Sequence, residues 1–136
     1  MNAEEFRRLA LALPNVEESN QLDHPDFRVN GRIFATLGYP DDSAAMVKLY
    51  PAQQQEFIAA HPTMFAPVEG AWGAKGCTRV RLQSAAEAPV LEALNAAWRN
   101  AAVRTELRRL EREEGVEPLK RRRRTKSPVA LPARET

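Results

Sequence analysis

Cationic side chains at alternate positions of predicted β-strands are the feature of this sequence best suited to chemistry. They are Arg28, Arg32, Lys48, Arg79 and Arg81. Alternate residues of a strand point to one face, so neighbouring strands would bring all five to one uncovered face of a sheet. We expect Trp72, Tyr50 and Phe34 to lie near them, with Lys75 beside Trp72. Cations interleaved with aromatic rings suit nucleic-acid binding, because phosphates contact the cations and bases stack on the rings.

The same cations also have a simpler interpretation. A sheet face in contact with water needs charged residues in any case, and Lys or Arg on an edge strand discourages pairing with another sheet. Residues 1–117 carry 13 Lys and Arg against 17 Asp and Glu, a net charge of −4. This acidic body weighs against nucleic-acid binding, because proteins that bind nucleic acid usually present a basic field.

Positive charge is concentrated at the end of the sequence. Residues 118–136 carry a net charge of +6 and dominate the overall charge of +2. Their polarity and prolines predict a disordered tail. Such a tail either attracts any polyanion by counterion release or serves only as a solubilising extension. The tail cations expected to contact a polyanion are Lys120, Arg121, Arg122, Arg123, Arg124 and Lys126.

The positions of the histidines and the cysteine in the sequence do not match the spacing of a metal site or a catalytic group. His24 lies beside acidic residues, but His61 has no spacing relation to it, so a surface or capping role is the simpler interpretation. Cys77 has no base or orienting group near it in the sequence, which favours a partly buried strand residue over a nucleophile. We therefore predict no catalytic residue, no metal and no cofactor.

Glycines at positions 70, 73 and 76 surround Trp72 without forming a phosphate-binding motif. Their spacing fits neither GxGxxG nor the P-loop, and no Lys–Ser/Thr pair follows. Residues 68–76 therefore predict a flexible loop that carries Trp72 and Lys75.

Length and composition restrict the class of protein. The chain has 136 residues, enough for one compact domain, which we place at residues 1–117. The single cysteine excludes an internal disulfide framework. No apolar run is long enough for a membrane span, and the acidic start has no signal-peptide pattern. A cytoplasmic protein is the expectation.

Periodicity and prolines divide this domain into helices and strands. Apolar residues at helical spacing predict a helix over residues 3–13 and a long helix that begins at, or one or two residues after, the capping box of residues 84–87. Pro51 suits the start of a shorter helix. Alternation predicts five strands, at residues 26–29, 32–37, 45–50, 64–66 and 78–82. The order is helix, three strands, helix, two strands, helix. Short connections and alternating faces predict a two-layer α+β fold, an antiparallel five-stranded sheet with helices on one face.

Asn30-Gly31 predicts a tight hairpin between the first two strands. A strict two-residue turn would place Arg28 on the same face as Ile33. A bulge at Gly31 would instead let Phe27, Ile33 and the following apolar residues share the buried face, and we favour this version.

Several segments resemble the YjbR/MmcQ family of small bacterial proteins. Residues 6–18 look like the opening helix of that family, and residues 24–37 are similar to its signature hairpin. Residues 70–73, 80–82 and 97–99 match later landmarks in the same order. The likeness covers about residues 4–103.

This resemblance implies a two-layer α+β fold similar to secretion chaperones, in agreement with the order of elements above. Members are commonly described as double-wing DNA-binding proteins, and no catalytic residues belong to the family pattern. The Arg-rich tail departs from the family's usual end. At the matching positions, the expected nucleic-acid-binding residues are Arg28, Arg32, Lys48, Trp72, Lys75, Arg79 and Arg81.

The leading hypothesis is a non-enzymatic, cytoplasmic protein that binds DNA with low specificity through an open sheet face, hairpin loops and a basic tail. It would be a monomer without membrane contact. One alternative is an adaptor with a chaperone-like fold that binds a protein partner. Another is a small-molecule-binding protein that uses the Trp72 loop.

Overall fold

The computed structural model describes residues 1–20, 24–38 and 41–114. The chain forms two compact units, Met1–Thr105 and Glu106–Thr136, of which the second is described only as far as Glu114. The predicted boundary between the domain and the tail, at residue 118, lies outside the described residues. No helix in the described ranges is long and apolar enough to cross a membrane.

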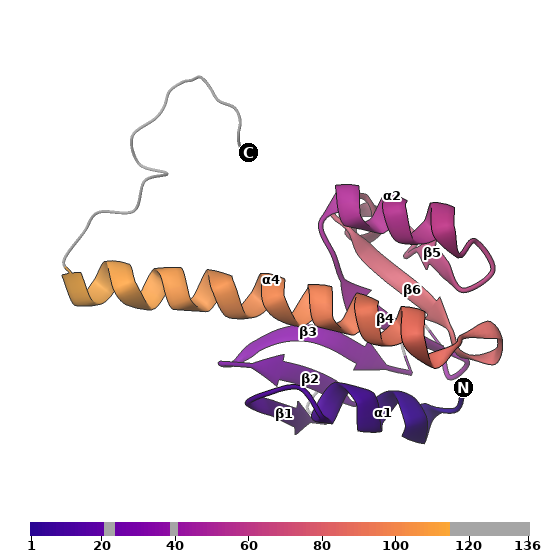
Figure 1. Cartoon of the computed structure of the whole chain (residues 1–136), viewed down its shortest axis with the longest axis horizontal. Helices are drawn as coiled ribbons and strands as arrows, with labels where there is room; N and C mark the ends of the chain where they lie inside the picture. Colours follow the sequence, from indigo (N-terminus) through magenta and orange to yellow (C-terminus); the bar gives the residue numbers. More distant parts are fainter. Residues whose placement is uncertain (21–23, 39–40, 115–136) are drawn as a thin grey trace. The chain divides into compact units, whose positions relative to one another are not determined.

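The first unit contains an antiparallel sheet together with helices (Figure 1). Its strands are β1 (Val16–Ser19), β2 (Asp26–Val29), β3 (Arg32–Leu37), β4 (Ala44–Lys48), β5 (Phe65–Pro67) and β6 (Cys77–Arg81). Its helices are α1 (Ala3–Leu11), α2 (Pro51–Ala60), α3 (Ala71–Ala74), the 3-10 turn η1 (Leu82–Ser84) and the start of α4 (Glu87–Glu114). All neighbouring strands are antiparallel, in the order β1-β2-β3-β4-β6-β5. The predicted α+β class is confirmed, with six strands where five were expected.

The additional strand is β1, which pairs with β2 from Val16 opposite Val29 to Ser19 opposite Asp26. Its sequence, Val-Glu-Glu-Ser, has no apolar alternation, so the pattern did not predict a strand. An edge strand needs little side-chain burial when backbone pairing holds it in place. The Arg7 guanidinium of α1 donates a 2.7 Å hydrogen bond to Glu18 and ties α1 to this edge.

The hydrophobic core lies between one face of the sheet and the helices. Phe6 and Leu9 of α1 and Val90 and Leu94 of α4 are buried there against the sheet. Phe57 and Ile58 of α2 pack at its border. Figure 1 shows the part of α4 that belongs to the first unit crossing the strands on this side. A smaller cluster, formed by Met46, Val68 and Cys77, lies apart from the main core.

The hairpin between β2 and β3 has the predicted tight turn but not the predicted bulge. Asn30 and Gly31 both have positive φ, and Val29 lies directly opposite Arg32. The register shifts further along, because Phe27 pairs with Ala35 while Arg28 pairs with Ile33. Phe34 is thus the extra residue. The bulge lies there because Phe34 and Ala35 are both buried in the core, whereas strict alternation would expose one of them.

Candidate functional site

The register shows which predicted cations share the sheet face opposite the main core. Lys48 lies opposite Cys77, and Arg79 lies opposite Met46. Arg81 lies two residues beyond Arg79 on β6, so it points the same way. Arg28 lies on the same face as its ion-pair partner Asp26, two residues earlier on β2. Asp26 pairs with Thr36, and Thr36 pairs with Met46, so these side chains all share the open face.

Arg32 does not share this face. It is opposite Val29, whose side chain is buried in the main core, so Arg32 points to the helical side at the end of the hairpin. The prediction of five cations on one face is therefore wrong for Arg32. Phe34 was expected near these cations but is fully buried in the core.

Carboxylates neutralise two of the cations on the open face. The Arg28 Nε donates to the Asp26 carboxylate at 2.9 Å, and this hydrogen bond raises the pKa of the guanidinium. The Arg79 Nη2 lies 3.2 Å from the Asp41 carboxylate. Arg81 donates to the Pro62 carbonyl at 3.4 Å. The open face is thus less cationic than its sequence suggests.

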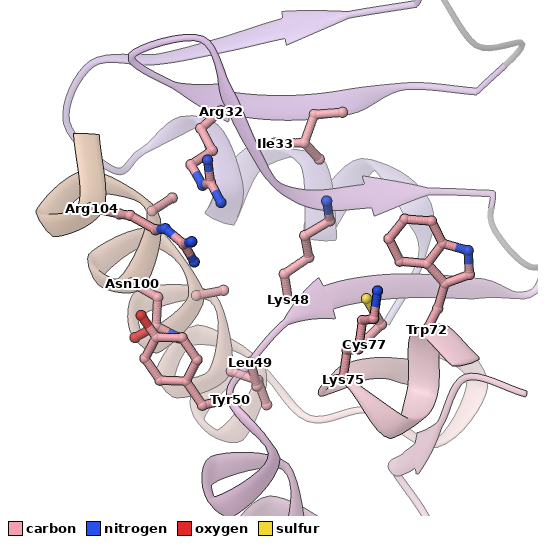
Figure 2. A pocket seen from close by; sticks show the side chains of 12 residues that line it. Arg32, Ile33, Lys48, Leu49, Tyr50, Trp72, Lys75, Cys77, Asn100 and Arg104 are labelled. Carbon is pink, nitrogen blue, oxygen red and sulfur yellow. The ribbon is translucent and has the colours of Figure 1, made fainter. Parts of the chain in front are cut away.

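A different group of cations surrounds a hollow of about 240 Å³ at the end of the sheet, which we call the basic pocket. Arg32 of β3, Lys48 of β4, Lys75 after α3 and Arg104 of α4 line it (Figure 2). The Arg32 and Arg104 guanidinium groups point toward the same open space (Figure 2). None of the described residues that line the pocket is acidic. Among described residues, none of these four cations forms an ion pair.

Two exposed aromatic rings border the basic pocket. Trp72 has 58% of its surface exposed and Tyr50 has 49%. The Lys48 and Lys75 ammonium groups lie 5.8 and 5.7 Å from the Trp72 ring centroid. These cation–π contacts hold both lysines beside the ring, so charge and a flat apolar surface are presented together.

Close backbone contacts fix the segment that carries Trp72. A Cβ at Gly73 would lie 1.7 Å from the Val68 carbonyl oxygen, and one at Gly76 would lie 1.9 Å from that of Leu49. The buried Gln54 side chain donates to the carbonyls of Gly73 at 3.1 Å and Cys77 at 3.0 Å. The predicted flexible loop is thus wrong, because these glycines allow α3 to pack tightly against its neighbours.

Hydrogen bonds also connect the other side of the pocket. The Gln53 Oε1 atom accepts from the Tyr50 backbone N–H at 2.9 Å and from the Asn100 amide at 2.8 Å. This oxygen therefore links the start of α2 to α4 beside Tyr50, so the pocket is largely formed without a ligand.

A second hollow of about 290 Å³, which we call the apolar hollow, adjoins the basic pocket and shares four lining residues with it. Its lining residues are His24, Ile33, Thr36, Met46, Lys48, Trp72 and Cys77. Burial raises the pKa of the Cys77 thiol, against the opposing effect of Lys48 and Lys75. The thiol is therefore protonated at neutral pH. No cluster of metal-ligating side chains occurs among the described residues.

The structure brings together Arg32, Lys48, Trp72 and Lys75 of the predicted set and leaves Arg28, Arg79 and Arg81 outside both hollows. The tail cations, residues 120–124 and 126, lie outside the described residues.

Sequence reasoning missed Arg104, which was not among the candidate cations. The signal was its spacing, because Arg104 follows the buried Ala97 and Ala101 on one helical stripe.

Comparisons with known proteins agree with this fold. The YjbR family model matches residues 11–100. The crystal structure of Deinococcus radiodurans protein DR2400, with domain DUF419, is similar with a TM-score of 0.65 and 21% identity. The match covers 85% of this chain and 89% of that chain. No curated protein matches.

Proposed function

The chain belongs to the YjbR family, and from this premise we propose that it is a non-enzymatic protein that binds DNA through unpaired bases and phosphates at the basic pocket. One observation carries the proposal. Four cations without a carboxylate partner among the described residues surround a hollow bordered by two exposed aromatic rings.

The charges support a polyanionic ligand. Arg32, Lys48 and Arg104 approach one open space from three different elements, and their like charges repel one another. A phosphate between them would replace this repulsion with charge-assisted hydrogen bonds. Arginine suits this role because its planar guanidinium matches the geometry of phosphate oxygens.

The aromatic rings favour single-stranded over double-stranded DNA. Trp72 and Tyr50 expose their rings beside the cations. A base stacked on such a ring contributes roughly 1–3 kcal/mol, and only unpaired bases offer a free face. Stacking depends little on base identity, so the proposed binding has low sequence specificity.

The proposal also includes a role for the tail, a cellular location and the absence of catalysis. The basic tail adds attraction that does not depend on sequence. We place the activity in the bacterial cytoplasm, where DNA is accessible. The protonated Cys77 thiol supports binding rather than nucleophilic catalysis at the site.

A protein partner is the second candidate, favoured by a separate observation. Leu107 and Leu110, three residues apart on α4, expose 58% and 38% of their surfaces. Apolar residues at this spacing on a helix are typical of helix-in-groove recognition.

Charge reversal in the full-length chain tests the DNA proposal. We compare Lys75→Glu, at an exposed position that lines the basic pocket, with Arg81→Glu, which removes a cation outside both hollows. Binding to a fluorescently labelled single-stranded oligothymidylate is measured by anisotropy at low and physiological salt. We expect Lys75→Glu to weaken binding about tenfold at low salt and Arg81→Glu to weaken it less than about twofold. Equal effects of the two changes would contradict the proposal.

A further inference from the structure

The apolar hollow beside the basic pocket has the features of a built ligand site. Its walls include the apolar side chains of Ile33 and Met46 and the indole of Trp72. It shares Ile33, Lys48, Trp72 and Cys77 with the basic pocket, so a single ligand can reach both. Lys48 lines both hollows and therefore lies where the apolar hollow meets the basic pocket.

Thr36 gives the lining of this hollow a polar side chain that finds no partner within the described part of the chain. Its side chain lies on β3, where it faces Met46 across the sheet, and only 4% of the residue is exposed. The Thr36 Oγ1 atom has no hydrogen-bond partner among the described residues. A buried hydroxyl left in this state is unfavourable. Because the oxygen itself is buried, a ligand atom can bond to it only after the Thr36 side chain turns toward the hollow.

These features specify the chemistry of the ligand. A ligand that fits them would have a body flat and apolar enough to lie against Trp72 and Met46, and it would carry a polar edge for the Thr36 hydroxyl. An attached anionic group would extend past Lys48 to the cations of the basic pocket. A nucleobase with its phosphate combines these properties.

We propose that the apolar hollow holds one unpaired nucleobase, with Thr36 bound to its polar edge and its phosphate in the basic pocket. This inference rests on the proposed function and adds a base subsite to it. A hydroxyl both donates and accepts hydrogen bonds, so Thr36 can bind the polar edge of any base. It therefore strengthens binding of a strand that carries bases without selecting one base.

The test compares oligonucleotides with and without bases. Full-length protein is titrated calorimetrically with a short oligothymidylate and with the same backbone carrying abasic sites. We expect the base-bearing strand to bind about tenfold tighter, because the abasic strand keeps the phosphates and loses stacking. Equal affinities would overturn both the base subsite and the stacking on Trp72 and Tyr50, and would leave only the phosphate contacts of the proposed function. Failure of both strands to bind would contradict the proposed function itself.

Thr36→Val tests whether the base lies in this hollow, because valine keeps the branched shape of the side chain and removes its hydroxyl. We expect about a threefold to tenfold loss for the base-bearing strand and no loss for the abasic strand. The free variant should melt no lower than the wild type, because the deleted hydroxyl has no hydrogen-bond partner in residues 1–20, 24–38 and 41–114. A base-dependent affinity that Thr36→Val leaves unchanged would overturn the assignment. Thr63→Val, an exposed position outside the hollow, is the matched control.

A last titration identifies the source of the nucleotide. Thymidine monophosphate and inorganic phosphate are added separately to the wild type. Weaker binding of the mononucleotide than of the strand supports a base within DNA. Binding of the mononucleotide as tight as that of the strand supports the hollow but assigns it to a free nucleotide, against the proposed function.

Discussion

Arg28 donates a 2.9 Å hydrogen bond to the carboxylate of Asp26, which lies two residues earlier on the same strand and is completely buried. A second contact, from the Arg28 Nη2 to the other carboxylate oxygen, measures 3.4 Å. Arg28 thus compensates a buried negative charge and is not available to bind phosphate.

The first prediction concerns this pair. Arg28→Ala leaves the Asp26 carboxylate buried without its cation, so we expect thermal denaturation to show a melting temperature lower by several degrees. DNA affinity of the folded variant should be unchanged within about twofold, because Arg28 lies outside the basic pocket. A stable variant with strongly reduced DNA affinity would show that Arg28 contacts DNA.

The second prediction concerns the glycines that hold Trp72 in place. Gly76→Ala places a Cβ against the Leu49 carbonyl at a φ of 109°, so we expect a loss of roughly 3 kcal/mol or more in the free energy of unfolding. Gly70→Ala, also at positive φ but with no atom within 4 Å of the added Cβ, should cost about 1–2 kcal/mol. Urea denaturation of both variants measures the difference, and equal losses would contradict the close packing of this segment.

The third prediction concerns the stacking surface. Trp72→Ala removes an exposed ring, so stability should change little while affinity for single-stranded DNA falls roughly tenfold. Affinity for duplex DNA of the same length should fall much less, because its base faces are covered. Leu91→Ala, an exposed apolar residue outside both hollows, is the control. Equal losses for single strands and duplexes would rule out stacking on Trp72.

The fourth prediction concerns pH. The Ser43 hydroxyl and backbone N–H donate to Asp41 at 2.6 and 2.9 Å, and together with Arg79 they lower the pKa of the Asp41 carboxyl below its ordinary 3.8. Because the Asp41 pKa is lower in the folded than in the unfolded protein, ionised Asp41 stabilises the fold at pH values above the unfolded-state pKa. This contribution to the free energy of unfolding is lost as the pH falls through the folded-state pKa. At neutral pH, Asp41 is thus ionised and neutralises Arg79.

A side-chain substitution tests this cause. Ser43→Ala removes the hydroxyl, the largest contribution, so the Asp41 pKa should rise toward 3.8 in an NMR titration of the carboxyl carbon. Ser84→Ala removes a hydroxyl that bonds to Thr63 instead and should leave the Asp41 pKa unchanged. An Asp41 pKa that is the same in Ser43→Ala and the wild type would contradict the assigned cause.

Local patterns were sufficient to predict most of the fold. The spacing of Phe6, Leu9 and Ala10 identified α1, and the positive-φ pair Asn30-Gly31 identified the hairpin. Strand β1 and the bulge at Phe34 were missed because they depend on pairing and burial between segments, which neither segment shows alone.

The candidate site was predicted only in part. Lys48, Trp72 and Lys75 were identified by residue type, but their grouping with Arg104 depends on how α4 crosses the sheet. The neutralisation of Arg79 by Asp41, which lies 38 positions away in the sequence, is likewise a tertiary contact. Thr36 could not be singled out, because a threonine on a strand gives no sign that its hydroxyl will find no partner among the described residues.

The most direct test of DNA binding at the basic pocket is a titration of the full-length, isotope-labelled protein with oligothymidylate, followed by NMR. We predict the largest shift changes at the Trp72 indole N–H, the Lys75 backbone amide and the side chains of Arg32 and Arg104. Changes confined to the tail, or centred on Arg79 and Arg81, would contradict this location.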